Sequence, residues 1–244
     1  MHALPCSLNL KWINKFISWM DSMFKKVQRF YIDFRFSCME LEKGIIFSIE
    51  DAKQAETCEE FATAILIERF DLPLIEEVVE IVSIPVIASC RQGHFIEAKL
   101  LEKMGVAFID ESIESNIGYI NKKDFSIPFI CMFGSREEAM KRINEGAKFL
   151  RTPWGTIEDI LEYISMTKEQ KVLASLTHAS PHDIAMLFQS GGYAAIISSH
   201  VFHTPNPPKL MKSLAEAAMY YNDIEKIFKI TKSVANILRG ETNI

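Results

Sequence analysis

Glycine is scarce in this chain, and its scarcity limits the sites and folds that the chain can form. Only 10 of the 244 residues are glycine, which is about 4% where about 7% is typical. No glycine-rich turn follows the first apolar run, where the sequence reads Phe47-Ser48-Ile49-Glu50-Asp51. A doubly wound open sheet normally has such a turn at this point, so that fold is only the second choice.

Other features that the chain lacks exclude classes of function. The formal net charge is -5 and no DNA-reading motif is present, so we expect no nucleic-acid partner. No uninterrupted apolar run reaches the length of about 18 residues that an ordinary membrane-spanning helix needs. The five cysteines are scattered without a C-x-x-C pair, which favours reduced thiols and a cytoplasmic protein.

The first forty residues differ in pattern from the rest of the chain. Apolar side chains recur there at spacings of three and four, with basic residues around them, as an amphipathic helix requires. The apolar positions are Trp12, Phe16, Trp19, Met23, Val27, Phe30 and Phe34. We expect residues 1–40 to form a helical extension that packs on its own domain or on a neighbouring subunit. A membrane-surface or targeting segment is the alternative, which Asp21 and Asp33 disfavour.

From Gly44 onward, short apolar runs alternate with helical patterns. The candidate strands are 45–49, 64–67, 85–88, 107–109, 129–131, 149–151, 172–175 and 195–198. The candidate helices are 52–61, 72–82, 95–104, 136–145, 157–165, 181–190 and 208–219. Strands that alternate with helices imply parallel βα units, and eight such units close into a barrel. The sequence therefore predicts one α/β domain over residues 41–244, a (β/α)8 TIM barrel preceded by an extra amino-terminal amphipathic helix.

Several segments of the predicted barrel occur together in a recognisable order. Ser-Ile-Pro-Val-Ile-Ala at 83–88 is followed by Arg91, Gly93 and His94, then by Leu-Glu-Lys-Met-Gly-Val at 101–106 and Ile-Asp-Glu-Ser at 109–112. With these segments the chain resembles the PdxS/SNZ family, the synthase subunit of pyridoxal 5'-phosphate synthase. The chain is a diverged and shortened example, and the resemblance does not extend to the amino-terminal helix.

The resemblance implies a chemistry whose key residues are replaced in this chain. The family condenses ribose 5-phosphate, glyceraldehyde 3-phosphate and ammonia from a glutaminase partner, and two of its lysines carry the intermediates as imines. At the matching positions this chain has Ser89 and Pro153. Neither side chain has an amine that can form a Schiff base. The family's aspartate at the end of the first strand matches Ser48, so that carboxylate is absent too.

The phosphate-binding loops implied by the resemblance are also altered. Barrels of this kind hold phosphate on glycine-rich loops after the last strands, where backbone N–H groups can approach the oxygens. The family's paired glycines match Leu176 and Thr177, and its Gly-Ser-Gly matches Ser198-Ser199-His200. The resemblance therefore implies a vestigial substrate pocket. Its candidate binding residues are Ser48, Ser89, Arg151 and Ser199.

Asp110 is the candidate catalytic residue, because it matches a family acid near the reaction centre, and Arg151 matches a pocket arginine. Their retention is compatible with some remaining substrate binding. The alternative is that the acid caps the next segment or forms a structural ion pair with the arginine. Both interpretations stay open at this stage.

Two other groups of residues could carry chemistry. His178 and His182 are four residues apart, and His200 and His203 are three apart, which are spacings that a zinc site can use. The pairs lie on separate predicted loops with no obvious further ligand, so we expect no metal, and we expect no cofactor. Cys90 could act as a thiol nucleophile, but free cysteines are usually buried packing residues.

These observations support two hypotheses of different class. The first is a non-catalytic paralogue, a structural or regulatory subunit that assembles with active PdxS/SNZ subunits or with itself. Apparent deletions in the loops mean that docking of a glutaminase cannot be assumed. The second is a working enzyme, of the synthase type or acting on another small sugar phosphate, that uses Asp110 and Arg151. A barrel mouth filled by Trp154, Leu176 and His200 would remove the basis of this second hypothesis.

Overall fold

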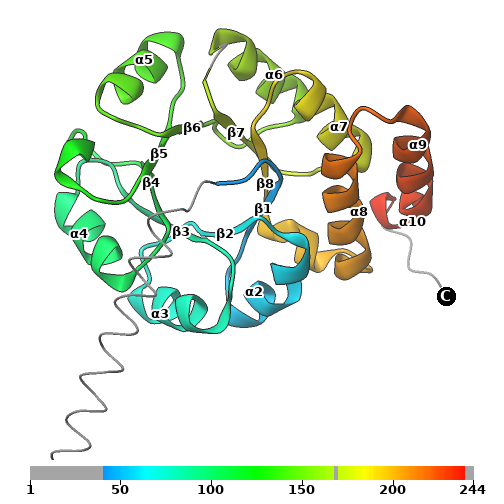
Figure 1. The fold of residues 1–244 in the computed structure, drawn as a ribbon, viewed down its shortest axis with the longest axis horizontal. Coiled ribbons are helices and arrows are strands. Elements are labelled where there is room, and N and C mark those ends of the chain that lie inside the picture. Colours follow the sequence, from blue (N-terminus) through cyan, green and yellow to red (C-terminus); the bar gives the residue numbers. More distant parts are fainter. Residues whose placement is uncertain (1–40, 168–169, 240–244) are drawn as a thin grey trace, which may run out of the picture. The chain divides into compact units, whose positions relative to one another are not determined.

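A computed structural model describes residues 41–167 and 170–239 of the chain (Figure 1). The predicted amino-terminal helix of residues 1–40 lies outside the described residues. The predicted domain boundary at residue 41 coincides with the first described residue and stays a prediction.

The described residues form a closed barrel of eight parallel strands that follow one another in chain order (Figure 1). The strands are β1 (Ile45–Ser48), β2 (Ala64–Ile67), β3 (Val86–Arg91), β4 (Phe108–Ile113), β5 (Phe129–Met132), β6 (Phe149–Arg151), β7 (Val172–Leu176) and β8 (Ala194–Ile197). The barrel closes where β1 pairs with β8, with Ile45 opposite Ala195. At this seam the Tyr193 hydroxyl donates a hydrogen bond of 2.6 Å to the Leu41 carbonyl. The prediction of a (β/α)8 barrel is confirmed.

Helices surround the barrel. The bounds are α2 (Ala52–Cys58), α3 (Leu72–Ile81), α4 (Phe95–Met104), α5 (Arg136–Asn144), α6 (Ile157–Met166), α7 (Pro181–Gln189), α8 (Pro207–Met219), α9 (Ile224–Ser233) and α10 (Ala235–Leu238). Short 3-10 helices are η1 (Glu59–Phe61), η2 (Lys122–Asp124) and η3 (Ser199–His203). The sequence patterns did not predict α9 and α10. Among the described residues, no helix combines the length and apolar character that crossing a membrane requires.

Short polar side chains fix where several helices begin, and thereby fix the loops that follow the strands. Ser180 begins α7 with a capping box completed by Asp183, and Thr156 begins α6 in the same way with Asp159. In a capping box, two backbone N–H groups that have no partner within the helix are satisfied reciprocally. The loops after β6 and β7 are therefore held at their helix ends.

Four strands end later than the sequence predicted, β5 and β7 by one residue and β3 and β4 by three and four. β3 continues to Arg91 and β4 continues to Ile113. Their pairing places Ser89 opposite Asp110 and Cys90 opposite Glu111. Arg91 is consequently the last residue of β3. Because successive side chains of a strand face opposite sides, Asp110 points into the barrel and Glu111 points toward the helices.

Candidate functional site

Arg151 is the centre of a polar cluster inside the barrel, at the carboxyl ends of the strands. Its Nη1 atom lies 2.6 Å from Asp110 Oδ2 on β4, and its Nη2 atom lies 2.5 Å from Glu68 Oε1, just after β2. Its Nε–H donates to Ser175 Oγ on β7 at 2.9 Å. Because β2 and β6 stand on opposite sides of the ring of strands, these contacts cross the barrel interior.

Asp110 uses only one of its two carboxylate oxygens in this cluster. Oδ2 accepts hydrogen bonds from Ser89 Oγ at 2.9 Å and from Ser112 Oγ at 2.7 Å, in addition to that from Arg151. Oδ1 is buried and has no hydrogen-bond partner among the described residues. Leaving a buried acceptor unpaired costs about 1–3 kcal/mol. The fold therefore leaves one buried acceptor of Asp110 without a hydrogen-bond partner among the described residues.

Glu68 connects the cluster to solvent. Its Oε2 accepts a hydrogen bond of 2.8 Å from Ser48 Oγ, and its Oε1 accepts one of 3.1 Å from the indole N–H of Trp154. The Glu68 side chain is 35% exposed, whereas that of Arg151 is completely buried. The Trp154 ring centroid is 5.2 Å from Arg151 Cζ, within the range of a cation–π interaction. We call these eight residues the mouth cluster: Ser48, Glu68, Ser89, Asp110, Ser112, Arg151, Trp154 and Ser175.

The charge state of Arg151 follows from its surroundings. Burial alone would lower the pKa of the guanidinium, but the negative charges of Asp110 and Glu68 and their hydrogen bonds raise this pKa above its ordinary value. Arg151 is therefore a permanent cation, and two carboxylates of the chain itself already neutralise it. An anionic ligand would have to compete with Glu68 and Asp110 for this cation.

The structure brings together four of the five predicted site residues. Ser48, Ser89, Asp110 and Arg151 belong to the mouth cluster, and their functional roles stay predictions. Ser199 lies outside the cluster, in η3, where its hydroxyl donates a hydrogen bond of 2.7 Å to Glu50 Oε1.

The other four members of the mouth cluster were not among the predicted site residues. Trp154 was expected at the barrel mouth, but only as a side chain that could fill it, and Glu68, Ser112 and Ser175 belong to no spacing pattern. The available signal was position, since each polar residue stands at or just beyond the end of an apolar strand. Whether such a side chain points into the barrel depends on which of the two alternating faces of the strand its position lies on, and on the path of the next loop.

A second polar cluster lies on the outer side of β4. Lys122 is the only lysine that is buried in the part of the chain that the structure describes. Its Nζ atom lies 2.6 Å from Glu111 Oε2 and 3.0 Å from Glu145 Oε2. Arg142 joins both carboxylates, at 3.5 Å from Glu111 and 2.5 Å from Glu145. We call Glu111, Lys122, Arg142 and Glu145 the wall cluster.

Glu111 also organises the loops above the wall cluster. Its Oε1 accepts hydrogen bonds of 2.9 Å from the backbone N–H groups of Gly93 and Ile120. Gly93 has a φ of 76°, and a Cβ there would lie only 2.8 Å from the backbone of Gly118. The loops after β3 and β4 can therefore pack this closely only because position 93 has no side chain. The wall cluster is a structural element, separate from the barrel mouth.

Of the four histidines considered for a zinc site, His178 lies in the loop after β7, His182 lies in the first turn of α7, and His200 and His203 lie in η3. The His178 and His200 rings have centroids 5.5 Å apart, and His182 Nδ1 is instead 2.9 Å from Ser180 Oγ. Within residues 41–167 and 170–239, no group of three or more histidine, cysteine or acidic side chains is placed to hold a metal ion. Of the side chains expected to fill the mouth, Trp154 contacts the mouth cluster, but Leu176 is buried in β7 and His200 is exposed.

The Cys90 thiol is poorly suited to act as a nucleophile. Burial raises its pKa, and the negative charges of Glu111 and Asp110 raise it further. The nucleophilic form of cysteine is the thiolate, and a raised pKa keeps the thiol protonated at neutral pH. The packing interpretation of this cysteine is therefore favoured.

A closed (β/α)8 barrel with a polar cluster at the carboxyl ends of its strands places the chain in a class whose active sites lie at that end. Orotidine 5'-phosphate decarboxylase from Pyrococcus horikoshii OT3 superposes with a TM-score of 0.59 at 14% identity, covering 72% of this chain and 99% of that chain. 3-Hexulose-6-phosphate synthase superposes with a TM-score of 0.58 at 12% identity, covering 71% and 99%. At such identities the similarity concerns the fold alone.

Sequence comparison defines the family. The model of the SOR/SNZ family matches residues 36–191. The pyridoxal 5'-phosphate synthase subunit PdxS of Bacillus cereus (strain B4264) is 30% identical over 263 aligned positions, which cover 82% of this chain and 89% of the relative. The PdxS subunit of Bacillus anthracis (strain A0248) is 31% identical with the same coverage. The chain belongs to the SOR/SNZ family, and the resemblance inferred from its motifs is confirmed.

Proposed function

We propose that this chain is a non-catalytic member of the SOR/SNZ family that acts in pyridoxal 5'-phosphate (vitamin B6) biosynthesis as a structural or regulatory subunit. It assembles with active PdxS/SNZ subunits or with itself, and a glutaminase is not a required partner. The role in this pathway is supported by relatives that carry the name of a pyridoxal 5'-phosphate synthase subunit.

The observation that carries the proposal is the environment of Ser89. Its hydroxyl donates a 2.9 Å hydrogen bond to Asp110, inside the barrel. The family resemblance assigns an imine-forming lysine to this position. A serine satisfies the carboxylate but offers no amine to the carbonyl of a sugar. The one buried lysine of the described residues, Lys122, is held by Glu111 and Glu145 on the outer side of β4.

The test is a search for the imine itself. The purified protein is incubated with ribose 5-phosphate, reduced with borohydride and weighed by intact-protein mass spectrometry beside an active PdxS subunit. We expect the control to gain the mass of the sugar and this chain to remain unchanged. A sugar mass on the natural chain would overturn the proposal, because another lysine would then form the imine.

A pair of variants at position 89 sharpens this test. Ser89→Lys introduces an amine beside Asp110, and we expect it to gain a borohydride-dependent sugar adduct. Ser89→Ala is the matched control, since it also removes the hydroxyl but adds no amine, and it stays unlabelled. The adduct of the lysine variant is located by peptide mapping, which separates position 89 from surface lysines.

The proposed subunit role is tested separately by co-assembly. The chain and an active PdxS subunit are mixed at equal concentrations and separated by size-exclusion chromatography with light scattering. Co-elution in one complex, or a stable assembly of the chain with itself, is the expected result. A chain that stays monomeric in both experiments would contradict the structural role.

One observation favours a second candidate function, an enzyme that acts on a small sugar phosphate. Asp110 Oδ1 has no hydrogen-bond partner among the described residues, so a substrate hydroxyl could bind there. This alternative predicts saturable binding of ribose 5-phosphate, measured by calorimetry. The binding should be lost in Asp110→Asn and kept in Ser199→Ala, because Ser199 lies outside the mouth cluster. No binding to the natural chain removes this alternative.

A further inference from the structure

The Glu68 carboxylate lies where three hydrogen-bond donors of the barrel mouth converge. Ser48 ends β1, Arg151 ends β6, and Trp154 follows in the loop before α6. Their hydroxyl, guanidinium and indole groups donate to the two Glu68 oxygens at 2.8, 2.5 and 3.1 Å. Hydrogen bonds between a cation and a carboxylate are stronger than those between neutral groups. The three donors therefore form a binding position for one carboxylate group, which we call the anion position.

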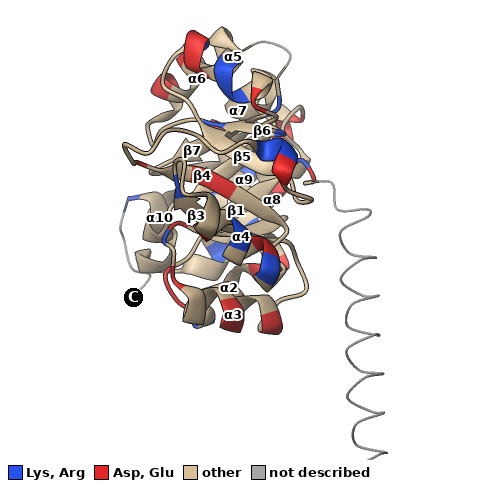
Figure 2. Ribbon diagram, turned by 90° about the vertical axis from the view of Figure 1, so that its left-hand side faces the viewer, with Lys and Arg blue, Asp and Glu red and all other residues tan. Residues whose placement is uncertain are grey.

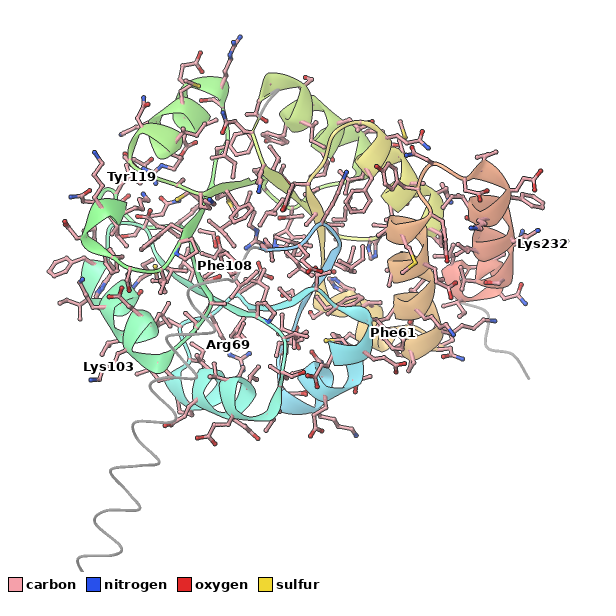
Figure 3. The ribbon with its side chains drawn as sticks, in the orientation of Figure 1. Phe61, Arg69, Lys103, Phe108, Tyr119 and Lys232 are labelled. Carbon is pink, nitrogen blue, oxygen red and sulfur yellow. The ribbon has the colours of Figure 1, made fainter. Side chains whose placement is uncertain are left out.

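The cation that holds Glu68 is Arg151 and not the neighbouring Arg69. Figure 3 labels Arg69 on the loop between β2 and α3. The Arg69 Nε atom lies 2.9 Å from Asp71 Oδ2, and its Nη2–H donates to the Glu50 carbonyl at 2.8 Å. Among the described residues, the ion pair of Glu68 is with Arg151, so the carboxylate is committed to the anion position.

Glu68 stands between Arg151 and solvent. The Arg151 side chain is completely buried, whereas that of Glu68 is 35% exposed. The second carboxylate on the same guanidinium is Asp110 of β4, whose side chain is also completely buried; acidic residues are red in Figure 2, where they mark β4. Because two carboxylates face one guanidinium, a further anion is repelled unless it replaces one of them. Glu68 is the carboxylate that an incoming anion can replace.

We propose that Glu68 is an internal ligand of Arg151, which occupies the anion position and keeps small carboxylates out of the barrel mouth. A group attached to the same chain has a high effective concentration at its site, so it outcompetes a free anion of the same chemistry. Rotation of this one partly exposed side chain toward solvent opens the position. The inference does not depend on whether position 89 can form an imine.

Removal of the Glu68 carboxylate tests this inference directly. Glu68→Ala deletes the atoms that correspond to acetate, so added acetate can restore the hydrogen bonds to the guanidinium. We expect acetate to bind this variant at least about tenfold more tightly than the natural chain, measured by calorimetry. Acetamide has the same shape without the charge, and it should not bind. Glu50→Ala is the matched control, since it removes an exposed carboxylate that contacts Ser199 but leaves Glu68 in place.

Unfolding experiments extend the test to a variant that folds poorly. A ligand that binds only the folded state raises the free energy of unfolding. Acetate, but neither acetamide nor chloride at the same ionic strength, should therefore raise the urea midpoint of Glu68→Ala. Glu68→Gln is a second variant, which keeps the shape of the side chain and loses its charge. Acetate should bind Glu68→Gln more tightly than the natural chain and less tightly than Glu68→Ala.

The indole donor gives a further check of the anion position. Adding Trp154→Phe to Glu68→Ala removes one of the three donors and should weaken acetate binding severalfold. The proposal is overturned if acetate binds neither Glu68→Ala nor Glu68→Gln more tightly than the natural chain, or if acetamide acts as acetate does. Acetate binding that is unchanged by Trp154→Phe would also contradict it. None of these outcomes changes the mass that is measured in the imine test.

Discussion

Asp110 and Glu111 are neighbours on β4, both buried, and each faces at least one arginine, yet their environments differ. Glu111 points outward, and both of its oxygens are used: Oε1 accepts two backbone N–H groups and Oε2 pairs with Lys122. Asp110 points inward and directs every contact to Oδ2. Both oxygens of Glu111 are thus used by the fold, whereas Asp110 keeps an acceptor that the fold does not use. The wall cluster is not saturated as a whole, because the guanidinium nitrogens of Arg142 form ion pairs but have no hydrogen-bond partner among the described residues.

The largest effect should come from the wall cluster. Glu111→Gln removes its central charge and leaves Lys122 and Arg142 to share Glu145. Breaking one partner of a buried ion pair lowers the free energy of unfolding by roughly 3–5 kcal/mol. Urea denaturation measures the loss, and the exposed Glu114→Gln serves as the control. A loss no larger than that of the control would show that the wall cluster is not needed for stability.

The corresponding change in the mouth cluster should cost less. Asp110→Asn likewise replaces a carboxylate by an amide, but Arg151 keeps its ion pair with Glu68. No hydrogen bond is lost at Oδ1, because this atom accepts none among the described residues. We expect the free energy of unfolding to fall by about 1–3 kcal/mol, measured in the same urea series. If Asp110→Asn destabilises more than Glu111→Gln does, the contrast between the two clusters is wrong.

The smallest effect concerns Glu97, a carboxylate on α4 that accepts hydrogen bonds from the backbone and side chain of Arg91. Burial raises its pKa, but hydrogen bonds from the Arg91 side chain and backbone lower it, and the result is below the ordinary value of 4.5. A lowered pKa in the folded state stabilises the protein above the unfolded pKa, and this stabilisation disappears as the pH falls through the folded pKa.

The lowered pKa of Glu97 predicts how the stability of the Glu97→Gln variant depends on pH. At pH 6 the variant should be less stable than the natural chain by about 1 kcal/mol, and the difference should shrink as the pH is lowered toward 3. Thermal or urea unfolding at several pH values measures it, with Glu114→Gln again as the control. A difference that grows on acidification would contradict the assigned hydrogen bonds.

The sequence predicted the fold well because a (β/α)8 barrel repeats one local pattern. The runs at 64–67 and 149–151 were located to the residue, since buried parallel strands are short apolar segments with polar borders. β3 was predicted too short because Ser89 and Cys90 interrupt its apolar run. Helix α9 was missed although Ile224, Ile227 and Phe228 recur at helical spacing; of these three residues the structure buries only Ile227.

The candidate site was predicted less completely than the fold. Ser89, Asp110 and Arg151 were found through strand ends and family resemblance. Glu68 was not among the predicted site residues, and nothing in its local sequence indicates that it reaches Arg151 across the barrel. The contact between Glu68 and Arg151, which are 83 positions apart, forms only when the strands close into a barrel. Local patterns in a single sequence do not predict such a contact.

The seam between β1 and β8 determines the order in which this molecule can be completed. Ile45 can pair with Ala195 only after residue 195 has been synthesised. The Leu41 carbonyl can likewise accept its hydrogen bond from the Tyr193 hydroxyl only after residue 193 has been synthesised. Contacts between residues so distant in sequence carry a loop-closure cost and form slowly. While the chain emerges from the ribosome, β1 therefore presents an unpaired strand edge until β8 has been synthesised, and such an edge invites pairing with other chains. The nascent chain is thus most vulnerable to aggregation before β8, which ends at Ile197, has been synthesised.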